Sequence, residues 1–322
     1  DEDINLLNFA DSLSGDVQVS TEKSASSQPP EIFIKSIKLN NVSVSFQETS
    51  DGIVSQSAKV EGINTEVNRI SSKGLKNIVE QVAFSLEKAD VTQNGENGKQ
   101  TQIIVNNLLI NTHNIEAEDT HVQIPEIKIE QDSMYVKDVT AGKTATISMT
   151  DFALQIKNMQ ALGEDISIEE VSSDSFKVSA GLPENIVFNL KDLVLFCKDI
   201  NITEKADAEP AEIIFNGKIV NEEHGDNHLG FYALVRDLAA DFPTINAVLT
   251  IIGLELEPMK SMIPPGTYQA LGGDAFDLNA TLSASETQLD CEINIDMIQG
   301  TKLGMKIGGT PEKPELDTSS VL

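Results

Sequence analysis

Two histidines four residues apart, His224 and His228, have the spacing that holds a metal ion when both lie on one face of a helix. Asp226 lies between them in the segment EEHGDNH, where Gly225 and Asn227 favour a turn between two strands over a helix. The surrounding strand pattern supplies no clear third ligand. We therefore interpret this segment as a solvated hairpin turn and predict no metal site.

The sequence also lacks the patterns of other catalytic sites. It contains no GxSxG nucleophile motif, no glycine-rich phosphate loop before a helix and no Cys/His nucleophile arrangement. Because the chain carries 51 acidic residues, a pair of neighbouring carboxylates does not by itself identify an acid/base site. We predict that the protein is not an enzyme, with no catalytic residues and no cofactor.

Cys197 and Cys291 are the only cysteines, and both fall in the apolar phase of their segments. Two buried thiols are the simplest interpretation. A disulfide between them stays open as an alternative in an oxidising compartment, because the sequence alone does not place the two residues together.

The composition restricts the classes of partner. The formal net charge of -28 repels phosphate backbones, so we predict no binding to nucleic acid. The length of 322 residues suggests about two domains or one elongated β architecture. Hydrophobic residues make up 40% of the chain, which fits a folded protein. The longest apolar run, Ile245 to Leu256, is too short to span a bilayer. The first residue is Asp, which predicts a processed or trimmed chain.

The elements that would position a binding surface are β-strands in which the alternation of apolar and polar residues is interrupted and then resumes. In EIFIKSIKLNNVSVSF, apolar residues alternate as far as Ile34, slip past Lys35 and Ser36, and resume at Ile37. A second slip precedes Val42. The same pattern recurs in IIVNNLLI (103–110), ISMTDFAL (147–154) and FNLKDLVL (188–195). Each polar pair between the two apolar halves ends in a small polar residue.

This slip has a simple geometric consequence. Side chains alternate between the two faces of a strand, so a spacing of three moves the apolar set to the other face unless a bulge or a sharp bend absorbs one residue. A bend repeated in several strands would fold the sheet along a line into a trough with an apolar lining. Corners of a β-sandwich would give the same pattern, and both interpretations stay open.

The strand phase predicts which side chains would line such a groove. They are Ile32, Ile34, Ile37, Leu39, Val44, Phe46, Ile103, Val105, Leu108, Ile110, Ile147, Met149, Phe152, Leu154, Phe188, Leu190, Leu193, Leu195, Leu278, Leu282, Ile293 and Ile295.

One segment breaks the strand pattern. In DFPTINAVLTIIG, the apolar residues at helical spacing are Phe242, Ile245, Val248, Leu249 and Ile252. Thr244 would be the N-cap, and Gly253 would end the helix. We predict one or two short helices near residues 242–262. The strict alternation that follows, over 276–282, 289–297 and 303–307, predicts a meander with short turns.

Together these patterns predict a mainly β protein: a long, curved, mostly antiparallel sheet folded into a taco-like groove. The predicted parts are a leader or linker over 1–30, a curved antiparallel sheet over 31–237, a helical insert or end cap over 238–263, a C-terminal meander over 264–317 and a tail over 318–322.

Residues 228 to 317 also carry a resemblance. A strand and a Leu/Pro-rich segment lead to the turn Gly272-Gly273-Asp274 and a strand that opens with Phe276 and Leu278. The chain then ends in GMKIGGTPEKPELD, an apolar strand followed by Gly-Thr and Lys-Pro. This region resembles the late portion of the AsmA-like family of bacterial envelope proteins, and IFIKSIKLNNVSVSF resembles the early strands of that family.

The resemblance implies a periplasmic protein of didermic bacteria, tethered to a membrane by an N-terminal segment absent from this chain. It further implies an apolar β-groove that carries lipid acyl chains, of a phospholipid or a fatty acid, in intermembrane phospholipid transport or outer-membrane homeostasis. Envelope proteins are the partners it suggests. The alternative is a non-catalytic β scaffold that binds a protein partner through a sheet edge.

Overall fold

The computed structural model describes residues 31–50, 53–95, 98–183, 186–203, 208–220, 227–257, 274–298 and 300–317. Their strands are β1 (Ile32–Ser50), β2 (Ile53–Lys73), β3 (Lys76–Asn94), β4 (Gln100–Glu118), β5 (His121–Thr140), β6 (Lys143–Leu162), β7 (Asp165–Ser173), β8 (Phe176–Leu182), β9 (Ile186–Ile202), β10 (Ala211–Ile219), β11 (Asn227–Arg236), β12 (Thr244–Glu255), β13 (Ala275–Ala284), β14 (Leu289–Met297), β15 (Lys302–Thr310) and β16 (Lys313–Asp317).

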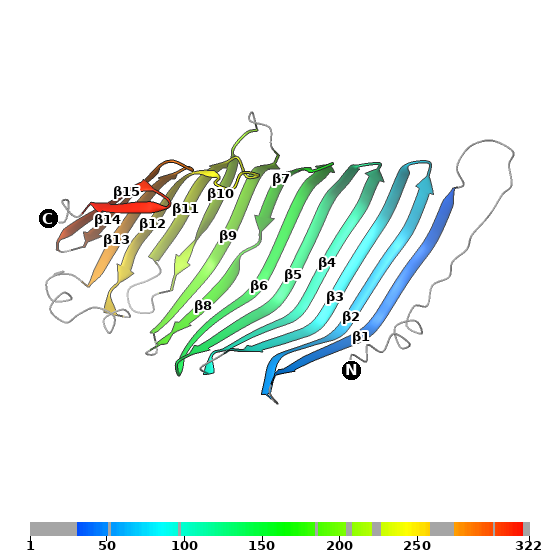
Figure 1. The fold of residues 1–322 in the computed structure, drawn as a ribbon, viewed down its shortest axis with the longest axis horizontal. Coiled ribbons are helices and arrows are strands. Elements are labelled where there is room, and N and C mark those ends of the chain that lie inside the picture. The colour runs from blue at the N-terminus through cyan, green and yellow to red at the C-terminus, as the bar shows by residue number, and fades with distance from the viewer. Residues whose placement is uncertain are drawn as a thin grey trace. The chain divides into compact units, whose positions relative to one another are not determined.

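These strands form one 16-stranded sheet (Figure 1). The strand order follows the sequence from β1 to β7 and then from β9 to β16, while β8 lies off this path and pairs with β9. The ladders are antiparallel. The prediction of a mainly β, mostly antiparallel fold is therefore confirmed.

The chain divides into two compact units, which are described separately below. The first unit comprises Asp1–Thr144 and Ser148–Glu164, and the second comprises Ala145–Ile147 and Asp165–Leu322. The division falls at the turn between β6 and β7, apart from Ala145–Ile147 of β6, which belong to the second unit.

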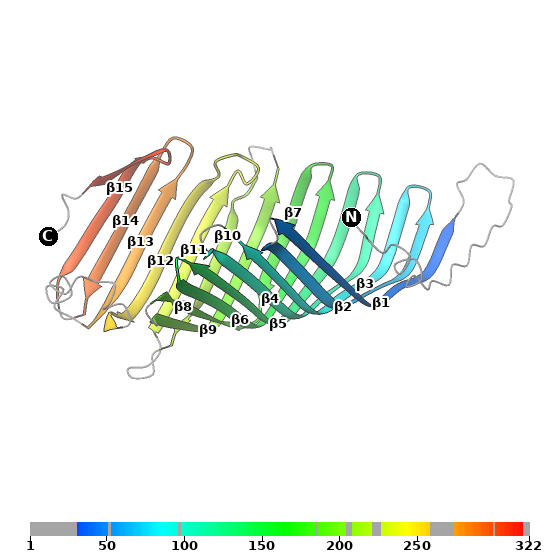
Figure 2. The same ribbon diagram turned by 60° about the horizontal axis from the view of Figure 1, so that its bottom comes forward.

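The first unit is a meander of long strands that bend part-way along their length (Figures 1 and 2). Its hairpin turns are short. Ala141 and Gly142 both have positive φ, as a two-residue type I′ turn requires, because the twist of that turn matches the twist of the flanking strands. Strands of 19 to 21 residues joined in this way place equivalent positions of neighbouring strands opposite one another.

The bends occur where the sequence pattern slips. We call Gly62, Glu87, Asn107 and Asp132 the first kink row, because the ladder pairs on either side keep one register through them from β2 to β5. In each of β2 to β5, the additional residue that interrupts the apolar alternation therefore lies directly opposite that of the neighbouring strand. The expectation of a bulge or a sharp bend resolves into a shared bend in these strands, whereas β1 carries true register shifts against β2 between Leu39 and Val44.

The residue types at the kinks suit this backbone. Gly62 and Asn107 have positive φ, a region that glycine and asparagine tolerate better than other residues. The Asn107 Nδ2 atom donates a hydrogen bond of 2.6 Å to Asp132 Oδ2 on β5. The kink is therefore tied between neighbouring strands by side chains as well as by the ladder.

A second level of kinks lies seven residues further along. Four strands show the pair of positive-φ residues at this spacing: Gly62 and Arg69 in β2, Asn107 and Asn114 in β4, Asp151 and Asn158 in β6, and Asp192 and Asp199 in β9. At three of the four predicted slips, the second residue of the polar pair adopts positive φ. At the fourth, Lys35 and Ser36 of β1, it is Arg69 on the opposite strand that does so.

The predicted helix near residues 242–262 is wrong for the part that the structure describes. Residues 244–255 form β12, which pairs over nine residues with β11 and also pairs with β13. The helical spacing arose because an inner strand with neighbours on both sides can carry apolar residues on both faces, such as Ala247 on one and Val248 on the other. Residues 258–262 lie outside the described part.

The C-terminal meander is present as predicted. β13, β14 and β15 pair in sequence without a register shift, and β15 pairs with β16. Two clusters of buried residues lie in this second unit: one contains Ala233, Val235 and Ala247, and the other contains Leu256, Phe276 and Met297. The predicted turn at Gly272-Gly273 lies outside the described residues.

Candidate functional site

The ladders of the first unit gather apolar side chains on one face, which we call the inner face. The β1–β5 register places Leu39, Thr65, Phe84, Ile110 and Ile129 in one row across five strands. A second row, on the other side of the first kink row, consists of Val44, Val60, Ala89, Val105 and Met134.

The opposite, outer face is polar. Lys38 of β1 forms an ion pair of 2.8 Å with Glu66 of β2, and Arg69 forms one of 2.7 Å with Glu80 of β3. The Asn68 side chain donates to the Glu66 carboxylate at 2.9 Å. The hydrogen bond from Lys38, together with that from Asn68, lowers the pKa of Glu66. These contacts favour the ionised form of Glu66 on the outer face.

The kinks turn the inner face towards the inside of the bend. At Asn106 and Asn107, two consecutive residues fall between the inner residues Val105 and Leu108, so the extra length lies on the outer face. Burial follows this geometry. The inner residues Gln131 and Thr112, next to the kinks, are each 9% exposed, whereas Ile103, near the start of β4, is 39% exposed.

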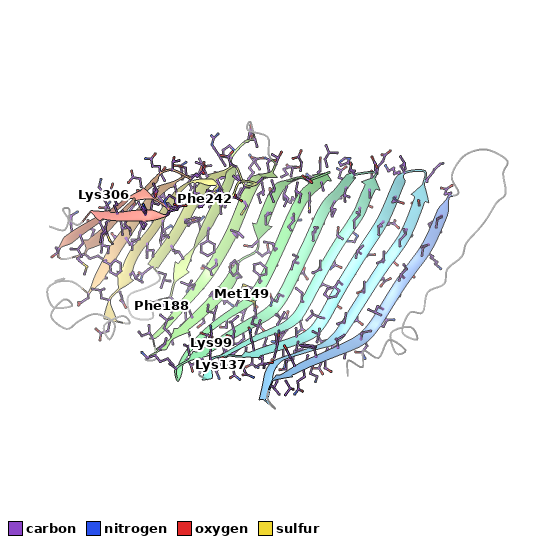
Figure 3. The ribbon with its side chains drawn as sticks, in the orientation of Figure 1. Lys99, Lys137, Met149, Phe188, Phe242 and Lys306 are labelled. Carbon is purple, nitrogen blue, oxygen red and sulfur yellow. The ribbon has the colours of Figure 1, made fainter. Side chains whose placement is uncertain are left out.

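The ladders of β1 to β5 place the predicted residues of β1 and β4 in the rows of this face, and three further predicted residues of the first unit belong to β6. The β1 set contains Ile32, Ile34, Ile37, Leu39, Val44 and Phe46; the β4 set contains Ile103, Val105, Leu108 and Ile110; the β6 set contains Met149, Phe152 and Leu154. The ladders bring the first two sets together through β2 and β3, as in the row that joins Phe46, Ala58, Val91 and Ile103. Met149 on β6 is labelled in Figure 3.

The other predicted residues belong to the second unit. These are Ile147 at the start of β6, Phe188, Leu190, Leu193 and Leu195 of β9, Leu278 and Leu282 of β13, and Ile293 and Ile295 of β14. Leu278 lies opposite Ile295, and Leu195 lies opposite Phe215. Phe188 is labelled in Figure 3.

Leu193 differs from the other predicted residues because it is only 1% exposed. It lies opposite Phe176 of β8 and against Gly217 of β10, where an added Cβ would come within 2.2 Å of Leu193 Cδ2. This side chain is a core residue in the structure and is not accessible to a ligand.

Sequence reasoning missed the contribution of β2. Ile63, Val67 and Ile70 continue the inner face between β1 and β3. The signal was present, because VEGINTEVNRI contains the same slips at Glu61-Gly62 and Asn68-Arg69. Its higher polar content hid the pattern.

The described residues offer little for metal or nucleophilic chemistry. No group of three or more His, Cys, Asp or Glu side chains among them could hold a metal ion. Cys197 is a buried free thiol whose pKa is raised by burial, and Cys291 is also free. Such a thiol is a weak nucleophile. His224 and Asp226 of the predicted turn lie outside the described residues.

Among the residues that the structure describes, no helix has the length and apolar content needed to cross a membrane. A comparison of the chain with protein-family models, curated proteins and solved structures finds no match. The resemblance to the AsmA-like family therefore stays a prediction.

Proposed function

We propose that the protein binds the acyl chains of phospholipids or fatty acids along the inner face of the first unit and carries them within the bacterial envelope. The observation that carries this proposal is the continuous apolar face of β1 to β5. In the described part of the first unit, all strands belong to the same sheet, and no helix lies over this face.

The free energy available on this face suits lipid binding. Ile32, Ile37, Val44, Phe46 and Ile103 are large apolar side chains that keep between 38% and 54% of their surface exposed. Burial of one CH₂ group is favourable by about 0.8 kcal/mol, so an acyl chain that covers these residues gains several kcal/mol. The hydrated outer face would stay in water when the inner face is covered.

The wider biological role follows from the same proposal. A periplasmic location, a tether to a membrane and a part in phospholipid transport or outer-membrane homeostasis agree with the resemblance of residues 228–317 to the AsmA-like family. Binding and transfer of lipid would need neither catalysis nor a cofactor. Envelope proteins would be the donors and acceptors of the lipid.

A matched pair of substitutions tests the proposal. Leu108 and Leu109 are neighbours in β4, and both are half-buried. Leu108 belongs to the inner face opposite Leu86, whereas Leu109 belongs to the outer face opposite Ser85. We expect Leu108→Gln to lower lipid retained in native mass spectrometry about tenfold, a change of about 1.4 kcal/mol, and Leu109→Gln to leave it unchanged.

The controls separate binding from folding. Both variants must keep the far-UV circular dichroism of the parent protein. Equal retention by the two variants, or a parent protein that takes up no lipid from phosphatidylcholine vesicles, would refute the lipid proposal.

The second candidate function is a protein scaffold. β1 is the first strand of the sheet order, spans 19 residues and exposes Phe33, Val44 and Phe46. A long terminal strand with exposed apolar side chains can receive a strand from a partner. A protein that binds no lipid in the experiment above would favour this function.

A further inference from the structure

The second unit carries an apolar stripe on the face opposite its buried core. The core face holds Ala233 and Ala247, whereas the alternate positions of the same strands point away from it. The register joins Phe196 of β9, Ile214 of β10, Tyr232 of β11 and Val248 of β12 into one row on that second face. Tyr232 and Val248 are exposed, so part of the stripe is accessible to a partner.

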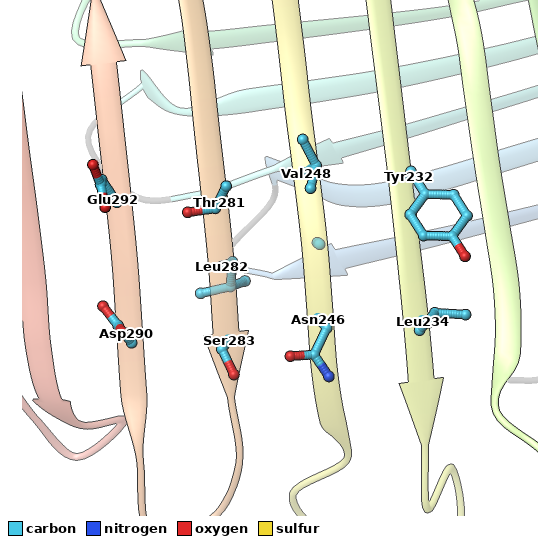
Figure 4. Close-up of a pocket in the computed structure, with 10 residues that line it drawn as sticks. Tyr232, Leu234, Asn246, Val248, Thr281, Leu282, Ser283, Asp290 and Glu292 are labelled. Atoms are coloured by element: carbon cyan, nitrogen blue, oxygen red, sulfur yellow. The ribbon is translucent and has the colours of Figure 1, made fainter.

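The stripe ends in a shallow hollow of about 310 Å³ on β11 to β14 (Figure 4). Tyr232, Leu234 and Val248 form its apolar side. Asn246, Thr281 and Ser283 supply amide and hydroxyl groups in the middle, on β12 and β13. Asp290 and Glu292 of β14 form the opposite side (Figure 4). The hollow therefore changes from apolar to anionic across four neighbouring strands.

Hydrogen bonds stabilise one carboxylate of the anionic side. Hydrogen bonds from Asn294 and Lys306 lower the pKa of Glu292, and Lys306 lies 3.2 Å from its carboxylate. Asp290 is exposed on the adjacent row. Lysine and arginine are absent from the ten residues that line the hollow. A cationic group on a partner would find two carboxylates there, of which Lys306 balances one.

We propose that this hollow docks a polypeptide segment of a partner protein that presents an aliphatic side chain and a lysine or arginine. The aliphatic group covers Val248 and the ring of Tyr232, and the cation lies against Asp290 and Glu292. Charge complementarity selects this partner, because the carboxylates of Asp290 and Glu292 attract a cation and no lysine or arginine lines the hollow to attract an anion.

The strand spacing sets the geometry of the partner. β12 and β14 are separated by β13, so Val248 and Glu292 lie about 10 Å apart at a spacing of about 4.8 Å per strand. Residues seven apart on one face of a helix are separated by about 10.5 Å. An amphipathic helix with a leucine and a lysine at this spacing matches the hollow.

The test uses a fluorescent, alanine-based helical peptide with leucine and lysine seven residues apart, titrated against the full chain by anisotropy. We expect saturable binding that weakens as salt is added. The double variant Asp290→Asn/Glu292→Gln should bind at least tenfold more weakly. Asp274→Asn/Glu286→Gln makes the same charge change outside the hollow and should bind like the parent protein.

The apolar side has its own matched pair. Val248 is 37% exposed and Val194, on the same face but outside the hollow, is 39% exposed. Val248→Ser should weaken peptide binding several-fold, and Val194→Ser should not. Far-UV circular dichroism checks that all variants fold.

Three results would overturn the proposal. The first is the absence of saturable peptide binding, and the second is an equal loss of peptide affinity in a variant and in its matched control. The third is binding of phosphatidylcholine vesicles that Val248→Ser abolishes, which would make the hollow a lipid site. Leu108→Gln in the first unit should leave peptide binding unchanged, so the docking proposal is tested independently of the lipid proposal.

Discussion

At the scale of single residues, the bends of the first unit depend on a few side chains that permit a left-handed backbone. Asn107, Asn114, Asp151 and Asn158 are of the types that tolerate positive φ, since their short polar groups can bond locally. Arg69 is the exception, and its guanidinium is held by Glu80 at 2.7 Å. The residue whose type is least suited to positive φ is thus held by an ion pair to the neighbouring strand.

Gly62 is the glycine of the first kink row, and substitution there should be costly. Its φ is +65°, and an added Cβ would lie 2.3 Å from Glu87 Cγ and 2.8 Å from Glu87 Cβ. We expect Gly62→Ala to lower the free energy of unfolding by about 2–3 kcal/mol, as measured by urea denaturation, because backbone strain and a steric clash combine.

Gly74 provides the control for this prediction. Its φ is +67°, but an added Cβ would meet no atom within 4 Å. Gly74→Ala should therefore cost only about 1 kcal/mol, the strain alone. The double variant Gly62→Ala/Glu87→Ala should recover part of the loss. Equal costs for the two glycines would contradict the clash at Gly62.

At the scale of elements, neighbouring strands of the first unit contact each other through apolar side chains on the inner face and through ion pairs on the outer face. β1 is joined to β2 by the Lys38–Glu66 pair on the outer face and by Leu39 opposite Thr65 on the inner face. Exposed ion pairs contribute little individually. Their effect is clearest in how stability depends on pH.

Glu66 predicts the direction of that dependence. Its folded pKa is lowered below the ordinary 4.5, mainly by the hydrogen bond from Lys38, so the unfolded chain takes up a proton first as pH falls. The stabilisation is therefore present above pH 4.5 and is lost below it. Glu66→Gln should unfold at a lower temperature than the parent protein at neutral pH, and this difference should shrink in acid.

Glu48 of β1 is a suitable control because it is an exposed carboxylate, and its side chain makes no ion pair within the part of the chain that the structure describes. Glu48→Gln should show no such pH-dependent difference in calorimetry. A difference between Glu66→Gln and the parent protein that grows in acid would show that the sign of the linkage is wrong.

At the scale of the whole molecule, charge repulsion opposes folding. A net charge of -28 on 322 residues raises the free energy of the compact state. We expect sodium chloride at about 0.15 M, where the Debye length is about 8 Å, to raise the unfolding temperature. A gain of about 1 kcal/mol corresponds to about 1.5 °C for 322 residues, at an unfolding entropy of about 2.1 cal/mol/K per residue.

The isoelectric point provides the comparison for the salt effect. Near pH 4.3 the net charge is close to zero, so the same addition of salt should change the unfolding temperature little. Unfolding temperatures that fall with salt at neutral pH would mean that the outer-face ion pairs outweigh the net repulsion.

The sequence by itself determined most of the strands and, in β4, β6 and β9, the positions at which they bend. Apolar alternation is a local property, and Asn-Asn in β4 or Thr-Asp in β6 marks a local break in it. Each signal lies within one strand, so no knowledge of neighbouring strands was needed. For the same reason the meander after residue 275 was predictable.

Only the tertiary structure decided what depends on neighbours. Pairing on both sides made residues 244–255 a strand although their spacing suits a helix, because ladder hydrogen bonds and two apolar surroundings outweigh local periodicity. The approach of Gly217 buried Leu193, which strand phase had assigned to the groove lining. Register, a property of pairs of strands, aligned the bends of β2 to β5 and so gathered the apolar side chains on one inner face.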